Sequence, residues 1–179
     1  KHDLEVAKTP DITATHGRGG FWLIDPDDLT IVSGNGNVNV NQVGNVFTSS
    51  GAGAQLGVDL VVAALGGGST VELRTGASAD PLGGTITLSA GVNLDYNGVG
   101  DATLSLFADR RIVIDGQIFD SVAGGDSLNL NLTADNDLNG TGNILINNTI
   151  SLGGGDFVVL RAIDFTTSAA IDTQGGDFI

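Results

Sequence analysis

The amino-acid sequence predicts an all-β fold: a right-handed parallel β-helix, a solenoid with three short strands in each coil. The first observation behind this prediction is a glycine–aspartate phrase that recurs through the second half of the chain. The second is a set of short apolar alternations that return every ~20 to 30 residues. A repeat of this length cannot bury its own apolar face, so neighbouring repeats have to complete it.

The glycine–aspartate phrase occurs four times, and its aspartates are Asp101, Asp126, Asp156 and Asp177. Each aspartate follows a corner that contains glycine, so we expect its side chain to cap the backbone of a turn. The alternative is a column of carboxylates that binds cations, or that supplies the acid and base of a polysaccharide-cleaving solenoid. Like charges stacked at the strand spacing would repel each other, which favours the capping role.

Three series of apolar positions predict the strands of the coils. The first is the pattern Leu-x-Leu-x-Ala-Asp at 104–109 and 130–135, with a weaker copy at 158–162 and a candidate earlier copy at 86–90. The second comprises 112–114, 144–146 and 163–165, and the third is a single anchor in each coil: Leu94, Ile118, Ile150 and Ile171. Alternation with a period of two turns one face of each strand inward.

The whole chain, residues 1–179, is predicted to be one β-helix segment with three parts. Residues 1–41 form a strand region around a tryptophan phrase, residues 42–68 are expected to be irregular, and residues 69–179 form the repeat coils. Within the middle part, 58–65 is predicted to be a short helix or turn that leads into a strand at 69–74. Asparagine alternates with Gly or Val at 35–41, which favours one or two strands with a solvated polar side.

The composition restricts the partners. The chain has 21 acidic and 7 basic residues and a net charge of −14, so it would repel the phosphates of a nucleic acid. No apolar stretch approaches the ~18 residues that a membrane-spanning helix needs, so membrane insertion is not expected. There is no cysteine, which excludes disulfides and thiol chemistry.

A phrase near the N-terminus resembles a known family. Residues 19–31 read Gly-Gly-Phe-Trp-Leu-Ile-Asp-Pro-Asp-Asp-Leu-Thr-Ile. They resemble a Trp-Leu-Ile-Asp-Pro phrase of filamentous-haemagglutinin-like exoproteins, the large bacterial adhesins of two-partner secretion. Residues 3–6 look like an early strand of that family, and the Leu-x-Leu-x-Ala-Asp units look like its repeat region. The resemblance implies a right-handed parallel β-helix from the central shaft, and it carries over no catalytic residues.

The resemblance also implies a place and partners. We expect a structural or adhesive segment of a secreted protein, extracellular or on the bacterial cell surface, that is exported through an outer-membrane secretion partner. Its expected partners are a host or neighbouring-cell surface, or other copies end to end in a fibre. The chain is expected to be a piece of a longer polypeptide, and it is not expected to be an enzyme.

The alternative function is a carbohydrate-binding or carbohydrate-cleaving extracellular β-helix. That function predicts a groove with clustered carboxylates, basic residues and aromatic rings. The chain has one Trp, one Tyr and 7 basic residues, which counts against such a groove.

One segment resembles a calcium loop. Residues 135–140 read Asp-Asn-Asp-Leu-Asn-Gly, the first half of such a loop, so Asp135, Asp137 and Asn139 are candidate Ca²⁺ ligands. The twelfth position of the loop calls for a bidentate Glu but is occupied by Ile146. A polar corner stabilised by Asx turns is therefore favoured over a metal site. No other cofactor is predicted.

The remaining charged residues are assigned to the surface. His2 and His16 are isolated, with no spacing typical of a catalytic or metal site. Arg110 and Arg111 follow the first Leu-x-Leu-x-Ala-Asp unit, and we expect them to pair with Asp109 and Asp115.

Overall fold

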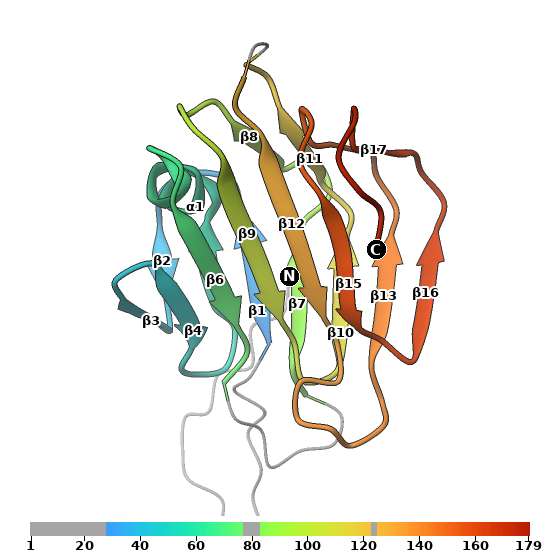
Figure 1. Ribbon diagram of the computed structural model, residues 1–179. Helices are drawn as coiled ribbons and strands as arrows, with labels where there is room; N and C mark the ends of the chain where they lie inside the picture. The colour runs from blue at the N-terminus through green and yellow to red at the C-terminus, as the bar shows by residue number, and fades with distance from the viewer. Residues whose placement is uncertain (1–27, 77–82, 123–124) are drawn as a thin grey trace, which may run out of the picture.

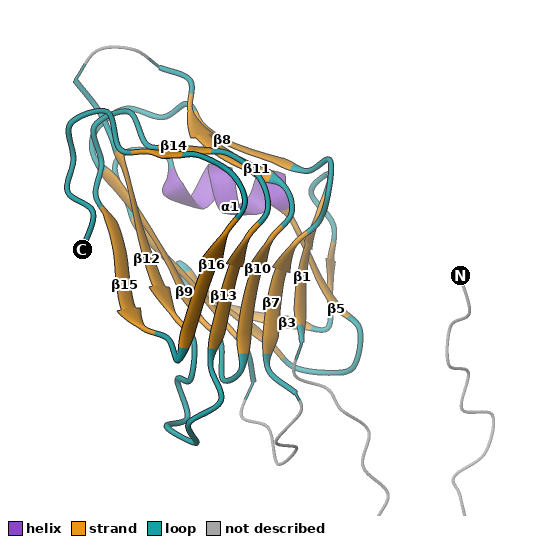
Figure 2. Cartoon of the chain, turned by 90° about the vertical axis from the view of Figure 1, so that its right-hand side faces the viewer, coloured by secondary structure: helices purple, strands orange, loops and turns teal. Residues whose placement is uncertain are grey.

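The computed structural model describes residues 28–76, 83–122 and 125–179 of the chain. These residues form three β-sheets around an apolar interior, with a short helix at one end (Figures 1 and 2). The tryptophan phrase up to residue 27 and the two histidines lie outside the described residues.

The three sheets have the following spatial orders. The first sheet runs β16 (Asp164–Thr167), β13 (Asn143–Ile146), β10 (Arg111–Ile114), β7 (Thr85–Leu88), β1 (Leu29–Val32), β5 (Ala54–Gly57) and β2 (Asn37–Val38). The second runs β15 (Phe157–Arg161), β12 (Leu128–Thr133), β9 (Ala102–Phe107), β6 (Thr70–Arg74), β4 (Val46–Ser49) and β3 (Val40–Val43). The third runs β17 (Ile171–Asp172), β14 (Ile150–Ser151), β11 (Gln117–Asp120) and β8 (Asn93–Tyr96). The helix α1 spans Val58–Leu65.

Alternating burial sets the register of the strands. In β10, Ile112 and Ile114 are fully buried, and in β13 the same is true of Ile144 and Ile146. Burying one such side chain contributes about 1.5–3 kcal/mol, whereas a typical hydrogen bond contributes about 0.5–1.5 kcal/mol net. A slip of one residue would turn every apolar side chain of a strand outward, so the apolar positions decide which residues face each other.

Several predicted repeat pairs are confirmed by the strand register. In parallel pairing between β9 and β12, Leu104 lies opposite Leu130 and Leu106 opposite Leu132. The predicted anchors also pair: Ile118 lies opposite both Leu94 and Ile150, and Ile150 lies opposite Ile171.

Residues 86–90 are not an earlier copy of the Leu-x-Leu-x-Ala-Asp unit. They overlap β7, which pairs with β1 and β10 in the first sheet. The strand that precedes β9 in the second sheet is β6, where Val71 lies opposite Leu104 and Leu73 opposite Leu106. The error arose because both strands show the same apolar alternation, which does not specify a sheet.

The predicted right-handed parallel β-helix with three short strands in each coil is wrong for this chain. The strands form mixed sheets and not a closed solenoid, because β2 runs antiparallel to β5 and β3 runs antiparallel to β4. Sheet order also departs from chain order. In the sheet β1 lies between β7 and β5, whereas in the sequence β5 comes between β1 and β7. The helix α1 packs against β8, β5 and β6 (Figure 2).

The middle part of the chain is more regular than predicted. Residues 42–68, which we expected to be irregular, contain β4, β5 and α1. The short helix predicted at 58–65 is confirmed, and the strand that follows it is β6. The two strands that the asparagine alternation predicts are β2 and β3, but they are exposed along most of their length and not on the polar side alone, since Val38 and Val43 are exposed too.

The second glycine of two Gly-Gly-Asp phrases is explained by close backbone packing. A Cβ atom on Gly155 would lie closer than 3.0 Å to the carbonyl oxygen of Leu128, and a Cβ on Gly176 would meet the carbonyl oxygen of Gly155 in the same way. A glycine is therefore required where one turn stacks on the backbone of the preceding one.

We expect Gly155→Ala to destabilise the protein by about 1–3 kcal/mol or more, because its methyl group would overlap a backbone oxygen that cannot move aside. Chemical unfolding in urea measures the change. Gly36→Ala is the matched control, since its Cβ would meet nothing within 4 Å. Equal stability of the two variants would contradict the close packing at Gly155.

Candidate functional site

Two neighbouring strands of the third sheet bring carboxylates to one edge of the molecule. Asp95 and Tyr96 end β8, and Asp120 ends β11. Asp120 lies opposite Tyr96 in the parallel pair, and both strands cross the top of Figure 1. Asp126 lies in the connection from β11 to β12, so the sheet and this connection position the cluster.

Tyr96 fixes the loop that follows β8. Its side chain is fully buried, and its hydroxyl donates a hydrogen bond to the carbonyl oxygen of Gly100. A backbone hydrogen bond from Gly68 also reaches the phenol. A Cβ on Gly98 would lie 2.7 Å from Cε2 of the ring, so this glycine lets the loop lie flat on the tyrosine.

The surroundings of Tyr96 disfavour its ionised form. Burial raises the pKa of Tyr96 above its ordinary value, and the negative charge of Asp126 raises it further. Asp120 and Asp101 act in the same direction, while the hydrogen bond from Gly68 lowers the pKa in part. Tyr96 is therefore a neutral hydrogen-bond donor at neutral pH and has a structural role.

Asp120 is only partly satisfied. One carboxylate oxygen accepts a hydrogen bond of 3.0 Å from the backbone N–H of Val122, whereas the other is buried and has no hydrogen-bond partner. Burial raises the pKa of Asp120, and the charges of Asp126 and Asp95 add to this effect. Asp120 therefore keeps its proton to a higher pH than an ordinary surface aspartate does.

Asp126 lines an open hollow at this edge. Its side chain is 9% exposed, and its Oδ2 atom is buried without a hydrogen-bond partner. The hollow has a volume of ≈ 220 Å³, and the residues that complete its lining are Val99, Gly100, Val122 and Gly125. The two valines are 75% and 38% exposed, so the hollow combines an anionic wall with an apolar rim.

The positive charges of the described residues lie at the opposite end. These residues contain arginine but no lysine. β6 and β15 end at Arg74 and Arg161, and β10 begins at Arg111. These strand ends lie at the bottom of Figure 1, whereas β8 and β11 lie at its top. The acidic hollow therefore receives no cation from the described part of its own chain.

The candidate calcium loop is a hydrogen-bonded corner. Asp135 accepts a bond of 2.7 Å from the backbone N–H of Gly140, and Asp137 accepts one of 2.6 Å from the side chain of Asn139. Asn139 in turn accepts from the backbone N–H of Thr141 at 2.9 Å. The predicted ligands thus come together, but their oxygens satisfy the turn, as Asx turns do. In the described parts of the chain, no three His, Cys, Asp or Glu side chains form a set that could hold a metal ion.

The repeat aspartates do not act alike. The Oδ1 atom of Asp156 caps the backbone N–H of Asp177 at 2.8 Å, which is the predicted role. The Oδ1 atom of Asp101 accepts a bond of 3.0 Å from the side chain of Ser127. Asp126, in contrast, borders the hollow. The four side chains were predicted as one series from a repeated phrase. Asp156 and Asp177 each precede one of the paired residues Phe157 and Phe178, but Asp101 and Asp126 are out of register, since Ala102 pairs with Leu128.

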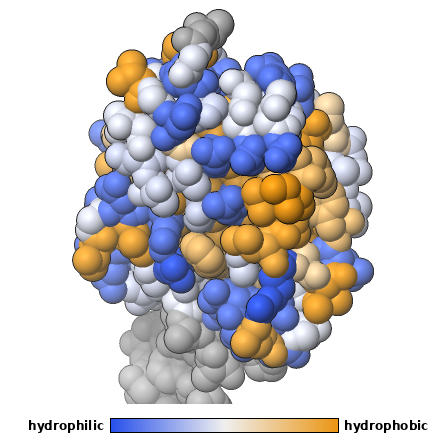
Figure 3. Space-filling view, in the orientation of Figure 1, coloured by the Kyte–Doolittle hydropathy of each residue, from blue (hydrophilic) through white to orange (hydrophobic). Residues whose placement is uncertain are grey.

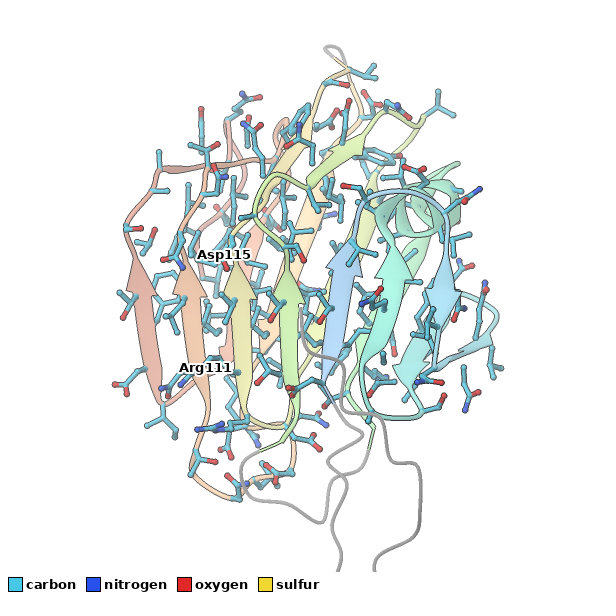
Figure 4. All side chains as sticks on the ribbon, turned by 180° about the vertical axis from the view of Figure 1, so that it is seen from behind. Arg111 and Asp115 are labelled. Carbon is cyan, nitrogen blue, oxygen red and sulfur yellow. The ribbon has the colours of Figure 1, made fainter. Side chains whose placement is uncertain are left out.

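The predicted pairing of Arg111 with Asp115 is wrong. Arg111 and Asp115 lie at opposite ends of β10 (Figure 4). Asp115 accepts a bond of 2.8 Å from the side chain of Asn147, and Asp109 accepts one of 3.1 Å from that of Asn136. The Nε atom of Arg111 is buried without a hydrogen-bond partner. Strand direction separates residues that are close in sequence.

A second hollow of ≈ 370 Å³ is lined by Thr133, Asn136, Leu138, Leu160 and Arg161. It contains neither a carboxylate nor an aromatic ring in its lining. Its side chains offer no pair of acid and base, so the acidic hollow is the stronger candidate for a functional site.

Sequence reasoning missed the two residues that organise the acidic hollow, Tyr96 and Asp120. Asp120, which the sequence analysis did not single out, ends β11. A usable signal was present: Tyr96 is the only tyrosine of the chain, and a tyrosine that replaces an aliphatic residue at an inward position needs a partner for its hydroxyl.

Comparison of the chain with protein-family models, with curated proteins and with solved structures finds no match. The resemblance to filamentous-haemagglutinin-like exoproteins rests on the sequence phrases given above and stays a prediction. Within residues 28–76, 83–122 and 125–179, no helix has the length and apolar character that spanning a bilayer requires.

Because the chain has a single tyrosine, the absorbance of tyrosinate during alkaline titration reports on Tyr96. We expect a midpoint above the ordinary 10.0, and a lower midpoint in Asp126→Asn, since removal of a nearby negative charge favours ionisation. Asp137→Asn, at an exposed corner, is the matched control. Identical midpoints in both variants would show that Asp126 does not act on Tyr96. Circular dichroism at each pH checks that the fold persists.

Thermal melting tests the corner at Asp135. We expect Ca²⁺ and EDTA to give the same Tm, because the candidate ligands already accept hydrogen bonds from the turn. Asp135→Ala should lower stability by about 0.5–2 kcal/mol in both solutions, the usual cost of a lost cap. A rise in Tm with Ca²⁺ that disappears in Asp137→Ala would establish the calcium site instead.

Proposed function

We propose that this chain is a structural or adhesive segment of a secreted or cell-surface protein that resembles filamentous haemagglutinin, and that it is not an enzyme. The sequence phrase at 19–31 and the Leu-x-Leu-x-Ala-Asp units support the family. The strongly acidic composition supports an extracellular or bacterial cell-surface location, where a net charge of −14 favours solubility. The proposal includes no cofactor.

The observation that carries this proposal is an apolar edge where the sheets end at β16 and β17. Large apolar side chains are exposed there, and they are Leu160, Ile163, Phe165, Phe178 and Ile179. In Figure 3 apolar side chains gather on the side of this face where β15 and the C-terminus lie. Exposed apolar side chains on an edge strand favour the addition of further strands.

Three phenylalanines organise this edge. The ring of Phe157 stacks on Phe178 with centroids 4.9 Å apart, and Phe165 meets both rings edge-on at 6.1 and 6.3 Å. The edge strand β16 has the sequence Asp-Phe-Thr-Thr, with neither the Lys nor the Pro that usually protects an edge. A strand that added to β16 would cover Phe165 and extend the apolar interior.

We assign this edge to contact with other copies of the chain, end to end. Contact with a host or neighbouring-cell surface, and export through an outer-membrane secretion partner, follow from the resemblance. In this account length and surface contact are the function, and turnover of a substrate has no part in it.

Sedimentation velocity tests the edge. We expect the wild-type protein to form species larger than a monomer as its concentration rises, and Phe165→Lys to remain monomeric, because a charge on an edge strand opposes pairing. Val99→Lys, at a 75% exposed position in the loop after β8 and away from the end strands of the first two sheets, is the matched control and should associate like the wild type. A wild-type protein that is monomeric at all concentrations would contradict association through this edge.

A second candidate function is carbohydrate cleavage, and one observation favours it. Asp120, whose pKa is raised by burial, lies near Asp126, and two carboxyl groups in different environments are what a glycosidase uses as acid and base. A glycan array together with a reducing-sugar assay distinguishes the two functions. Sugar release that is lost in Asp120→Asn would favour the enzyme over the structural segment.

A further inference from the structure

The edge strand β16 has backbone groups that are free to pair with a further strand. It is the last strand of the first sheet (Figure 1), and within the described residues no strand pairs with its outer side. The backbone N–H groups of Asp164 and Ser168 donate to carbonyl oxygens at or next to the ends of β13, at 3.2 and 2.9 Å. Hydrogen-bonding direction alternates along a strand, so the backbone groups of Phe165 and Thr167 point to the open side.

The residues on either side of β16 limit the register of an added strand. The N–H group of Ile163 already donates to the connection before β13 at 2.6 Å, and that of Ala169 donates to the hydroxyl of Thr167 at 3.3 Å. An antiparallel partner exchanges both backbone groups of each hydrogen-bonded pair. A second copy of β16 therefore fits in one register, in which Phe165 lies opposite Thr167 of the partner copy and Thr166 lies opposite its own counterpart.

This register joins the apolar interiors of two copies. Phe165 lies opposite Ile144 in the pair with β13, and Ile144 is buried, so Phe165 is on the inner face of the sheet. A two-fold axis perpendicular to the first sheet keeps the inner faces of both copies on the same side. The Phe165 residues of the two copies become diagonal neighbours at about 7–8 Å, within reach of aromatic side chains.

The same register keeps the charges of the two copies apart. Asp164 lies opposite Ser168 of the partner copy and not opposite another carboxylate, which avoids a destabilising pair of like charges. The two Asp164 residues are separated by ~14 Å along the strands. That separation exceeds the Debye length of about 8 Å at physiological ionic strength, so repulsion between these exposed carboxylates is largely screened.

The opposite end of the molecule offers no matching surface. There β2 ends the first sheet and β3 ends the second, and only Asn39 separates them in the sequence, so the chain crosses from one sheet to the other. The side chain of Asn39 donates to the carbonyl oxygen of Ala52 at 2.8 Å. The exposed large apolar residues of these two strands are Val38 and Val43, and neither described strand exposes an aromatic ring.

Building on the proposed association through this edge, we propose that its occupant is the same edge of a second copy. The product is an isologous, antiparallel dimer that closes at two chains. β16 continues the first sheet across the two-fold axis, and the rings of Phe157, Phe165 and Phe178 form the contact between the two interiors. A head-to-tail fibre would need a second surface complementary to this edge, whereas an isologous contact uses one surface twice.

Disulfide cross-linking tests the two-fold axis, because the chain has no cysteine of its own. Thr166→Cys places two thiols opposite each other, where the Cα separation of about 4.5 Å suits a disulfide. We expect mild oxidation to convert this variant into a covalent dimer that reduction returns to single chains. Ser168→Cys is the matched control, since its two thiols lie ~14 Å apart along the strands and are too distant to bond.

Sedimentation equilibrium separates closed from open association. We expect the mass of the wild-type protein to rise with concentration and to level off at two chains. Val43→Lys, at a 78% exposed position on β3, should leave this dimer unchanged, whereas Phe165→Lys should abolish it. Circular dichroism checks that each variant keeps its β-sheets, and these masses decide the proposal even where Thr166→Cys fails to fold.

Three results would overturn the proposal. Masses that grow beyond two chains exclude a closed dimer, and loss of that growth in Val43→Lys assigns a head-to-tail contact, so that association through the edge survives. A dimer in which Thr166→Cys cross-links no better than Ser168→Cys has another register or another surface. A protein that is monomeric at all concentrations overturns both this dimer and the association on which it rests.

Discussion

Parallel pairing of strands that come from successive passes of the chain is the constraint on which this structure depends. It places like residues opposite each other, as Leu104 and Leu130 show, so one apolar choice made repeatedly in the sequence builds a continuous interior. The same pairing brings corner backbones into contact. That contact leaves no space for a Cβ atom at Gly155 or Gly176, which explains why glycine recurs at these corners.

The polar side chains at the corners are explained by the same pairing of successive passes. A corner leaves backbone N–H groups without a strand partner, and short acidic or amide side chains satisfy them. Asp135 does so for Gly140, and Asp156 does so for the backbone of the next pass at Asp177. A sequence that matches half of a calcium loop can therefore arise because a turn needs acceptors.

The acidic hollow differs from these corners, because carboxylate oxygens there lack hydrogen-bond partners. Asp120 and Asp126 each keep a buried oxygen without a partner, and their charges act on each other and on Tyr96. Buried carboxylates without partners lower stability, and these lie at one edge, far from the arginine-bearing strand ends. The apolar edge at β16 is a second exception, because Phe165 on this strand and Ile163, Phe178 and Ile179 beside it are exposed among the described residues. Acidic side chains gather at one of these edges and exposed apolar side chains at the other.

In the repeat region, 69–179, the sequence by itself determined most strand positions and several partners, including Leu94, Ile118 and Ile150, because apolar alternation is a local property of each strand. It did not predict the strands β4 and β5 within 42–68. It did not determine the antiparallel pairs β2–β5 and β3–β4, or the place of β1 between β7 and β5, because alternation carries no strand direction. The hollow was also decided by tertiary structure. Whether the carboxylate of Asp126 caps a turn, as that of Asp156 does, or remains without a partner depends on which backbone group the neighbouring pass presents. That neighbour is set by register between distant segments, and no pattern within one repeat records it.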